Sequence, residues 1–164
     1  MTQPCPESLK AISIHAPHAY AICKGIKQYE HRSRATKQRG WILIHASQSK
    51  ASDSYLVDYG INKSTIKRGA IIGAAYLTDC TWDSEYGCYA YHLESPILFD
   101  QAIEGVKGCQ TIFWGAKTTE KQAAFAAAWK LISAPRILIT PPPINTKPHF
   151  DDICIEAFTT IQRQ

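Results

Sequence analysis

The sequence lacks any apolar run long enough to cross a membrane. No segment reaches the ~18 consecutive apolar residues that a transmembrane helix requires. Residues 1–9 are polar, contain two prolines, and lack the basic and then apolar pattern of a secretory signal. These absences predict a cytoplasmic protein that does not use a membrane as its partner.

Several chemical motifs are also missing. The six cysteines are scattered without Cys-x-x-Cys spacing, and no two histidines have the i, i+4 spacing of a helical zinc site. The sequence contains neither the Gly-x-Ser-x-Gly nucleophile motif nor the glycine-rich patterns that bind dinucleotides or phosphates. We therefore expect no metal and no cofactor. We expect the cysteines to be free core thiols, with a disulfide or a reactive thiol as the alternatives.

The composition is that of an ordinary folded domain. The chain has 164 residues, of which 45% are hydrophobic and 20% are charged. A chain of this length buries about two thirds of its unfolded surface, so its core needs neither a metal nor disulfides. No internal repeat or low-complexity tract divides it. We expect one domain spanning residues 1–164, with a C-terminal extension.

Positive charge is concentrated in the N-terminal third. The net charge is +4, and the stretch from Ser8 to Ser52 holds eight basic residues against a single acid, Glu30. The bases are Lys10, Lys24, Lys27, Arg32, Arg34, Lys37, Arg39 and Lys50. A locally basic face favours a polyanionic partner, nucleic acid in preference to a membrane, and the alternative is an ordinary solvated surface.

Hydrophobic periodicity predicts an α+β fold. Alternating or continuous apolar residues favour strands, and one apolar stripe at helical spacing favours a helix in the last third. We expect strands at 10–16, 28–34, 41–47, 70–80, 89–99 and 111–114, and helices at 17–24, 52–59 and 119–133. Further on, we expect a strand at 136–140, a stiff Pro-rich connector at 141–143, and a final strand or edge segment at 152–160.

Local signals mark the ends and bends of these elements. Pro17 suits the first turn of a helix, and Gly25 suits the left-handed residue that ends it. We expect Ser52 to cap the second helix and Thr119 to open the capping box of the last. Gly73 lies inside a long apolar run and predicts a bend or bulge in a barrel-like sheet.

The most informative stretch runs from Gly25 to Arg32, because Lys27, Glu30 and Arg32 bring three ionisable groups to the start of a strand. In a regular strand Lys27 and Glu30 would point to opposite faces, since their separation is odd. They meet only if Lys27 belongs to the turn or a bulge rotates it. If the two side chains are in contact, three roles are open. The pair acts as a general acid and base, it binds a phosphate or a nucleobase together with Arg32, or it forms a structural ion-pair cluster.

Aromatic residues lie among these charges. Tyr20, Tyr29, Trp41 and Tyr91 are candidates for stacking on nucleobases, and the alternative for each is packing in the core. Trp129 belongs to the apolar stripe of the last helix and is expected in the core.

Taken in chain order, the motifs resemble those of the ASCH domain family within the PUA-like superfamily. The similar segments are residues 12–19 (ISIHAPHA), 25–32 (GIKQYEHR), 40–47 (GWILIHAS), 69–79 (GAIIGAAYLTD) and 107–114 (KGCQTIFW). The string Gly-x-Lys-x-x-Glu-x-Arg at 25–32 is the most characteristic of them. The resemblance covers about residues 10–115, which we take as the core, and does not explain the extension at about 116–164.

The resemblance implies a small PUA-like β-barrel flanked by short helices, with a cleft between the first helix, the Lys27 turn and the barrel. It also implies that the ligand is RNA, another nucleic acid or a nucleotide. The candidate ligand-binding residues are His15, Pro17, His18, Lys27, Glu30, Arg32, Arg34, Lys37, Arg39, His45 and Ser47. His15 and His18 stand where an arginine and an aromatic residue are common in the family.

An enzymatic alternative follows from the same resemblance. One bacterial branch of the family hydrolyses the acetyl amide of N4-acetylcytidine, and ribonuclease activity occurs among other members. In that branch a threonine stands where this chain has Glu30, so a covalent mechanism does not carry over. The alternative function is a hydrolase of a modified nucleoside or a ribonuclease, with Lys27 and Glu30 as the acid/base pair. A role in protein interaction is a third possibility.

Overall fold

The computed structural model describes residues 3–134, which contain six strands and three α-helices. In chain order the elements are β1 (Lys10–Ile14), α1 (Ala16–Cys23), β2 (Tyr29–Arg32), β3 (Gly40–Ala46), α2 (Tyr55–Asp58), a short 3-10 helix (Lys63–Thr65), β4 (Ala70–Asp83), β5 (Cys88–Ile103), β6 (Phe113–Trp114) and α3 (Thr119–Ser133). The expected α+β class is therefore confirmed.

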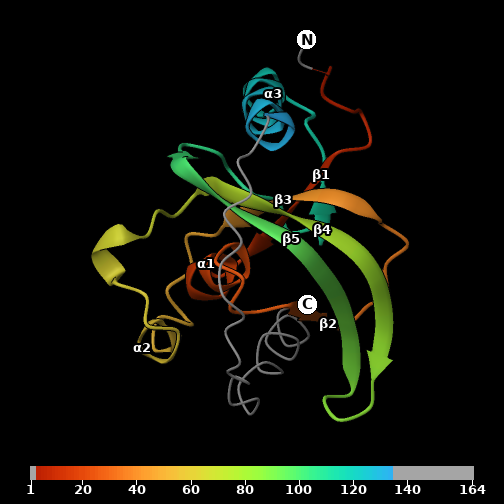
Figure 1. The fold of residues 1–164 in the computed structure, drawn as a ribbon, viewed down its shortest axis with the longest axis vertical. Helices are drawn as coiled ribbons and strands as arrows, with labels where there is room; N and C mark the ends of the chain where they lie inside the picture. The colour runs from red at the N-terminus through yellow and green to blue at the C-terminus, as the bar shows by residue number, and fades with distance from the viewer. Residues whose placement is uncertain (1–2, 135–164) are drawn as a thin grey trace.

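The strands form one mixed sheet in the order β2-β5-β4-β3-β1-β6. β1 and β3 are parallel, and every other neighbouring pair is antiparallel. The long β4–β5 hairpin bends strongly, so the sheet curls into a half-barrel (Figure 1). This curl gives the sheet a concave face, on which α1 lies, and an opposite face, on which α3 lies (Figure 1).

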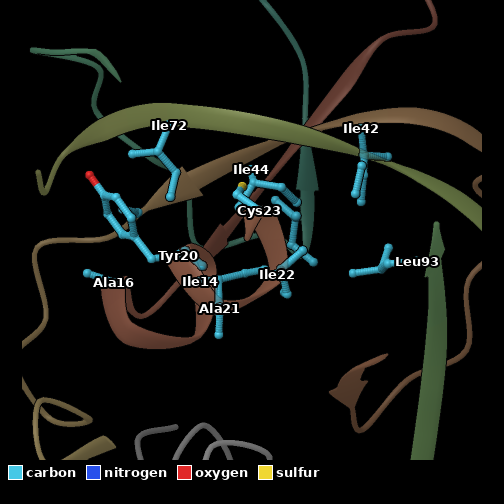
Figure 2. Packing of buried hydrophobic residues seen from close by; sticks show 14 of the residues in the cluster. Ile14, Ala16, Tyr20, Ala21, Ile22, Cys23, Ile42, Ile44, Ile72 and Leu93 are labelled. Atoms are coloured by element: carbon cyan, nitrogen blue, oxygen red, sulfur yellow. The ribbon is translucent and has the colours of Figure 1, made fainter. Parts of the chain in front are cut away.

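Each face of the sheet has its own hydrophobic core. On the concave face, every residue of α1 is buried against side chains of the strands, among them Ile14, Ile44 and Leu93 (Figure 2). On the opposite face, Phe125 and Ala128 of α3 pack over the sheet. An apolar helix enclosed on all sides needs no polar stripe, which explains the sequence APHAYAIC of α1.

The bend in the sheet depends on a glycine where two segments come close together. The register between β4 and β5 shifts between Ile71 and Gly73, which confirms the bulge that Gly73 predicted. A Cβ atom at Gly73 would collide with the backbone carbonyl oxygen of Ile97 and would lie 2.7 Å from Cys23 Sγ. Only glycine therefore lets β4, β5 and α1 approach this closely.

Two predicted strands are longer than the sequence indicated. β4 continues to Asp83 and β5 runs from Cys88 to Ile103, because the two strands pair almost to the tight turn between them. Gly87 in that turn has φ +63°, a left-handed conformation that glycine adopts without strain. The ends expected at 80 and 99 were therefore wrong.

The helix boundaries are mostly confirmed, and two caps are corrected. Pro17 lies in the first turn of α1, and Gly25 follows the helix with φ +76°, as predicted. α3 has the predicted bounds, but its cap is Thr118, whose Oγ1 accepts from the Lys121 N–H at 3.3 Å. The α2 helix starts only at Tyr55, and Ser52 does not cap it, because its hydroxyl hydrogen-bonds His15 Nδ1 instead.

Other expectations concern cysteines, metals and membranes. The five cysteines within residues 3–134 are free thiols, and of these Cys23 and Cys88 are buried. Cys154, the Pro-rich connector and the segments at 136–140 and 152–160 lie outside the described residues. In the described part of the chain, no cluster of three or more His, Cys, Asp or Glu side chains is arranged to hold a metal ion. No helix there is long and apolar enough to span a bilayer.

Candidate nucleic-acid interface

The turn after α1 brings Lys27 and Glu30 together. Gly25 reverses the chain, and the Lys27 N–H donates to the carbonyl of Ala21, so Lys27 still belongs to the turn and precedes β2. Lys27 Nζ then lies 2.5 Å from Glu30 Oε2. Lys27 and Glu30 are therefore in contact because Lys27 belongs to the turn, and not because a bulge rotates it.

Arg32 binds the other oxygen of the same carboxylate. Its Nε donates to Glu30 Oε1 at 3.0 Å, and one terminal nitrogen lies 2.8 Å from that oxygen. The same terminal nitrogen donates to the backbone carbonyl of Ser13 at 3.0 Å. Because Ser13 lies on β1 and Arg32 on the distant edge strand β2, this side chain connects the two sides of the curled sheet.

The three side chains form a buried cluster with an excess of positive charge. The side chains of Lys27 and Glu30 are 6% and 2% exposed, and that of Arg32 is 24% exposed. One carboxylate faces two cations, so the cluster carries a net charge of about +1 when all three groups are ionised. A buried charge of this kind is tolerated because each partner is hydrogen-bonded. Arg32 is its most accessible member.

Tyr91 continues this cluster across the sheet. It is the β5 partner of Glu30 and is fully buried. Its hydroxyl donates to the carbonyl of Arg34 at 2.6 Å, and its ring stacks on Phe113 with centroids 5.9 Å apart. Burial, with smaller contributions from Cys80 and Glu30, raises the pKa of Tyr91 to about 12, so the phenol stays neutral at physiological pH.

A cleft borders the Lys27 turn. A pocket of about 380 Å³ lies between α1, the turn and β5. Its lining residues are Ile22, Gly25, Lys27, Gln28, Leu93, Glu94, Ser95 and Pro96. This is the position that the family resemblance implied for the cleft. Ser95 has φ +48°, a strained conformation for a residue other than glycine, and lies where β5 bulges away from β4.

Three candidates lie at the start of α1: His15, Pro17 and His18. The two histidines form hydrogen bonds to the segment around α2. His15 Nδ1 hydrogen-bonds Ser52 Oγ at 2.7 Å. His18 is buried and hydrogen-bonds the Tyr59 hydroxyl at 2.9 Å. Pro17 is buried in the first helical turn. These contacts hold α2 against α1, and they stabilise the wall of the concave face.

His45 lies on the opposite face of the sheet from Glu30. Its Nε2 donates to the carbonyl of Val106 at 2.7 Å, because that oxygen only accepts, so Nδ1 accepts from the Ser13 hydroxyl at 3.1 Å. Ser13 Oγ in turn accepts from Trp114 Nε1 at 3.1 Å. Burial, and to a smaller extent the charge of Lys121, lowers the pKa of His45. His45 is therefore a neutral link beneath α3, apart from the cleft.

The remaining candidates divide between surface and interior. Arg34, Lys37 and Arg39 are exposed in the loop between β2 and β3. Arg39 lies 3.3 Å from Asp79 and also donates to two carbonyls of its own loop. Ser47 follows β3, and its buried hydroxyl has no hydrogen-bond partner within residues 3–134. The basic loop is therefore accessible to a polyanion, whereas the hydroxyl of Ser47 is buried.

The aromatic candidates also separate. Tyr20 is buried and its hydroxyl accepts from the Lys67 N–H, and Trp41 packs edge-on against Tyr76. Tyr29 is 39% exposed and contacts the His92 ring. Sequence reasoning missed Trp82, the most exposed ring of the described residues, at 57%. The one feature of the sequence that could have indicated Trp82 was its position in β4, but the predicted strand ended before it.

The sequence matches the model of a known family. The family model described as the ASCH domain matches residues 12–124, so it reaches into α3, beyond the end of the resemblance near residue 115. Crystal structures of the ASCH protein of Zymomonas mobilis and of one of its variants are each 16% identical, with a TM-score of 0.48. They cover 71% of this chain and 93% and 95% of their own chains. No curated protein matches the sequence. Because the family model spans well over half of its length, the chain belongs to the ASCH domain family.

Proposed function

We propose that this protein binds a single-stranded nucleic acid, RNA in the first place, and holds one base at the cleft beside Lys27. The observation that carries the proposal is the buried Lys27–Glu30–Arg32 cluster at the edge of a pocket of about 380 Å³. The ASCH family is PUA-like and is associated with RNA binding, which supports the same conclusion.

The chemistry of the cluster favours a ligand rich in acceptor atoms. The ammonium group of Lys27 has three N–H donors, and the guanidinium group of Arg32 has five. Glu30 holds both cations in place and offsets only one of their charges. The donors that do not face Glu30 suit the carbonyl oxygens and ring nitrogens of a nucleobase, or a phosphate oxygen.

The loop between β2 and β3 supplies positive charge outside the cleft. It carries Arg34 and Lys37 on its surface, and Arg34, its second residue, provides the carbonyl to which Tyr91 donates. The loop therefore starts directly beside the cluster. Exposed cations at such a place suit the phosphates that flank a bound base, and phosphate contacts make the affinity depend on salt.

The test is fluorescence anisotropy of a labelled single-stranded RNA, titrated at several salt concentrations. We expect wild-type affinity to fall steeply with salt. Arg34→Ala should reduce the slope of log K against log salt by about 1, the contribution of one phosphate contact. Lys130→Ala, which removes an exposed cation from α3 on the other face, is the matched control and should leave the slope unchanged.

The buried lysine needs its own variant. Lys27→Ala should weaken binding at every salt concentration, and circular dichroism must show that it is folded. If the alanine variant unfolds, Lys27→Arg, which keeps the positive charge, is measured in its place. Absence of binding by the wild type at low salt would refute the proposal, and so would equal effects of the Arg34 and Lys130 changes.

The close contact between Lys27 and Glu30 favours one second candidate, hydrolysis of a modified nucleoside such as N4-acetylcytidine. In that reaction water adds to the acetyl carbon, the carbon–nitrogen bond breaks, and cytidine and acetate leave, with Glu30 and Lys27 exchanging the protons. Chromatography of the products decides between the two functions. Turnover that Lys27→Ala abolishes while binding persists would establish the enzyme; cleavage of the RNA itself would indicate a ribonuclease.

A further inference from the structure

We propose that the concave face of the β4–β5 hairpin holds a second base, stacked on Trp82 and bordered by Tyr89 and Arg32, so that the ligand is an oligonucleotide and not a free nucleoside. This inference rests on the proposed function and extends it from one base to a row of bases. It follows from the pairing register of three strands and from the exposure of one indole ring.

The register places two rows of side chains on the same face. Tyr89 of β5 is the partner of Arg32 on one side and of Trp82 on the other. One step along the face, Tyr91 is the partner of Glu30 and of Cys80. Directly paired residues, and residues two apart on a strand, share a face of the sheet. The rings of Trp82 and Tyr89 confirm this, with centroids 5.1 Å apart.

Burial changes along this face from the inside outwards. Tyr91 is fully buried and Tyr89 is partly buried against the first core. Trp82 is 57% exposed and belongs to neither hydrophobic core of the described residues. A large indole ring left in solvent at the end of an otherwise buried row has one open side available for a ligand.

The distance across the row requires more than one base. Arg32 and Trp82 lie two strands apart, about 10 Å at the usual spacing between strands. Stacked bases on one strand rise by only ~3.4 Å each. A base held at the Lys27 cleft therefore cannot also stack on Trp82. A segment of several nucleotides is needed to reach both positions.

The charges around the row favour a nucleic acid over a protein segment as its occupant. Arg32 stands at one end, and the exposed Arg34 and Lys37 follow it in the adjoining loop. Of two nearby acids, Asp79 is ion-paired with Arg39, and Asp83 accepts a hydrogen bond from His31, whose pKa is lowered by burial. Glu85, in the turn of the hairpin, is an exposed acid three residues from Trp82. Aromatic rings beside cations are the common platform for single-stranded nucleic acids.

The experiment compares two kinds of ligand and three variants. The ligands are a single-stranded RNA of about ten nucleotides and the four ribonucleoside monophosphates. We expect Trp82→Ala to weaken RNA binding about tenfold, the loss of one stacked base, and to leave monophosphate binding unchanged. Trp82→Phe should restore most of the affinity. Tyr76→Ala is the matched control, because Tyr76 is an exposed ring of the same strand that packs against Trp41 on the other face.

The outcomes separate the two proposals. RNA binding that survives Trp82→Ala unchanged, or falls equally with Tyr76→Ala, overturns the second position and leaves the first intact. An equal loss for RNA and monophosphates also overturns it, since the ring would then act on the cleft. A wild-type protein that binds neither ligand refutes the proposed function itself. Tryptophan fluorescence that RNA but not the monophosphates quenches in the wild type, and that RNA does not quench in Trp82→Phe, would support the stacked geometry.

Discussion

Lys27 Nζ lies 2.5 Å from Glu30 Oε2, and both side chains are almost completely buried. Since Arg32 holds the second oxygen of the same carboxylate, Glu30 is the common counter-charge of two cations. A single acid therefore supports both the geometry of the cleft and the connection from Arg32 to Ser13 on the far side of the sheet.

Loss of the charge on Glu30 should destabilise the fold strongly. In Glu30→Gln, Lys27 and Arg32 are left buried without a counter-charge, and we expect the free energy of unfolding to fall by about 3–5 kcal/mol. Urea titration followed by circular dichroism measures the change. Glu85→Gln, at an exposed acid, should have little effect. Equal stability of the Glu30→Gln variant and the wild-type protein would show that the cluster is not a structural support.

A methyl group at Gly73 should be poorly tolerated. Its Cβ would collide with the Ile97 carbonyl and contact Cys23 Sγ, and we expect Gly73→Ala to cost ~2 kcal/mol of stability. Adding Cys23→Ala should not rescue it, because the carbonyl belongs to the backbone. Thermal unfolding of both single variants and the double variant tests this. Full rescue in the double variant would place the obstacle at the sulfur alone.

Relief of backbone strain at Ser95 should stabilise the protein. Ser95 has φ +48°, where a Cβ is unfavourable, so Ser95→Gly should raise the free energy of unfolding by about 1 kcal/mol. Ser84→Gly, in the hairpin turn and without a positive φ, should give no such gain. Urea titration measures both. A loss of stability in Ser95→Gly would show that the serine side chain contributes more than its strain costs.

Acid should weaken the fold through His45. Burial lowers its pKa in the folded state, so the unfolded chain, with a histidine pKa near ~6.5, binds the proton first as pH falls. This contribution is complete above pH ~6.5 and is lost below it. NMR titration of the His45 ring should give a pKa below that value. The decline in Tm from neutral to acid pH should be shallower in His45→Asn; an identical decline would contradict the assignment.

The parts of the fold that depend on local sequence could be predicted. The apolar stripe of α3 predicted its bounds. Gly25 and Gly73 predicted a turn and a bulge from their places after a helix and inside an apolar run. The cap at Thr118 was misplaced by one residue, since Thr119 has the same chemistry. Ser52 was expected to cap a helix, and its partner His15 is distant in sequence.

The site was only partly predictable, because some of its contacts join residues that are distant in sequence. Glu30 and Lys27 are close in sequence, so their contact needed only the turn. The contact of Arg32 with Ser13 depends on how the whole sheet curls, which no local pattern encodes. His45 lies near other candidates in the chain, yet the alternation of side chains along β3 directs it to the α3 face. Trp82 lay beyond the predicted end of its strand.

The position of β1 has a consequence for the order in which the molecule assembles. β4 and β5 are neighbours in sequence and can pair as a local hairpin, but Ala11 of β1 aligns with Leu43 on one side and with Trp114 on the other. The segments that separate β1 from β3 and β6 in the chain are long, and bringing their ends together costs conformational entropy before any stabilising contact forms. β1, which precedes the other described strands in the chain, is therefore the last of them to gain both of its neighbours, and we expect its completion to limit the folding rate.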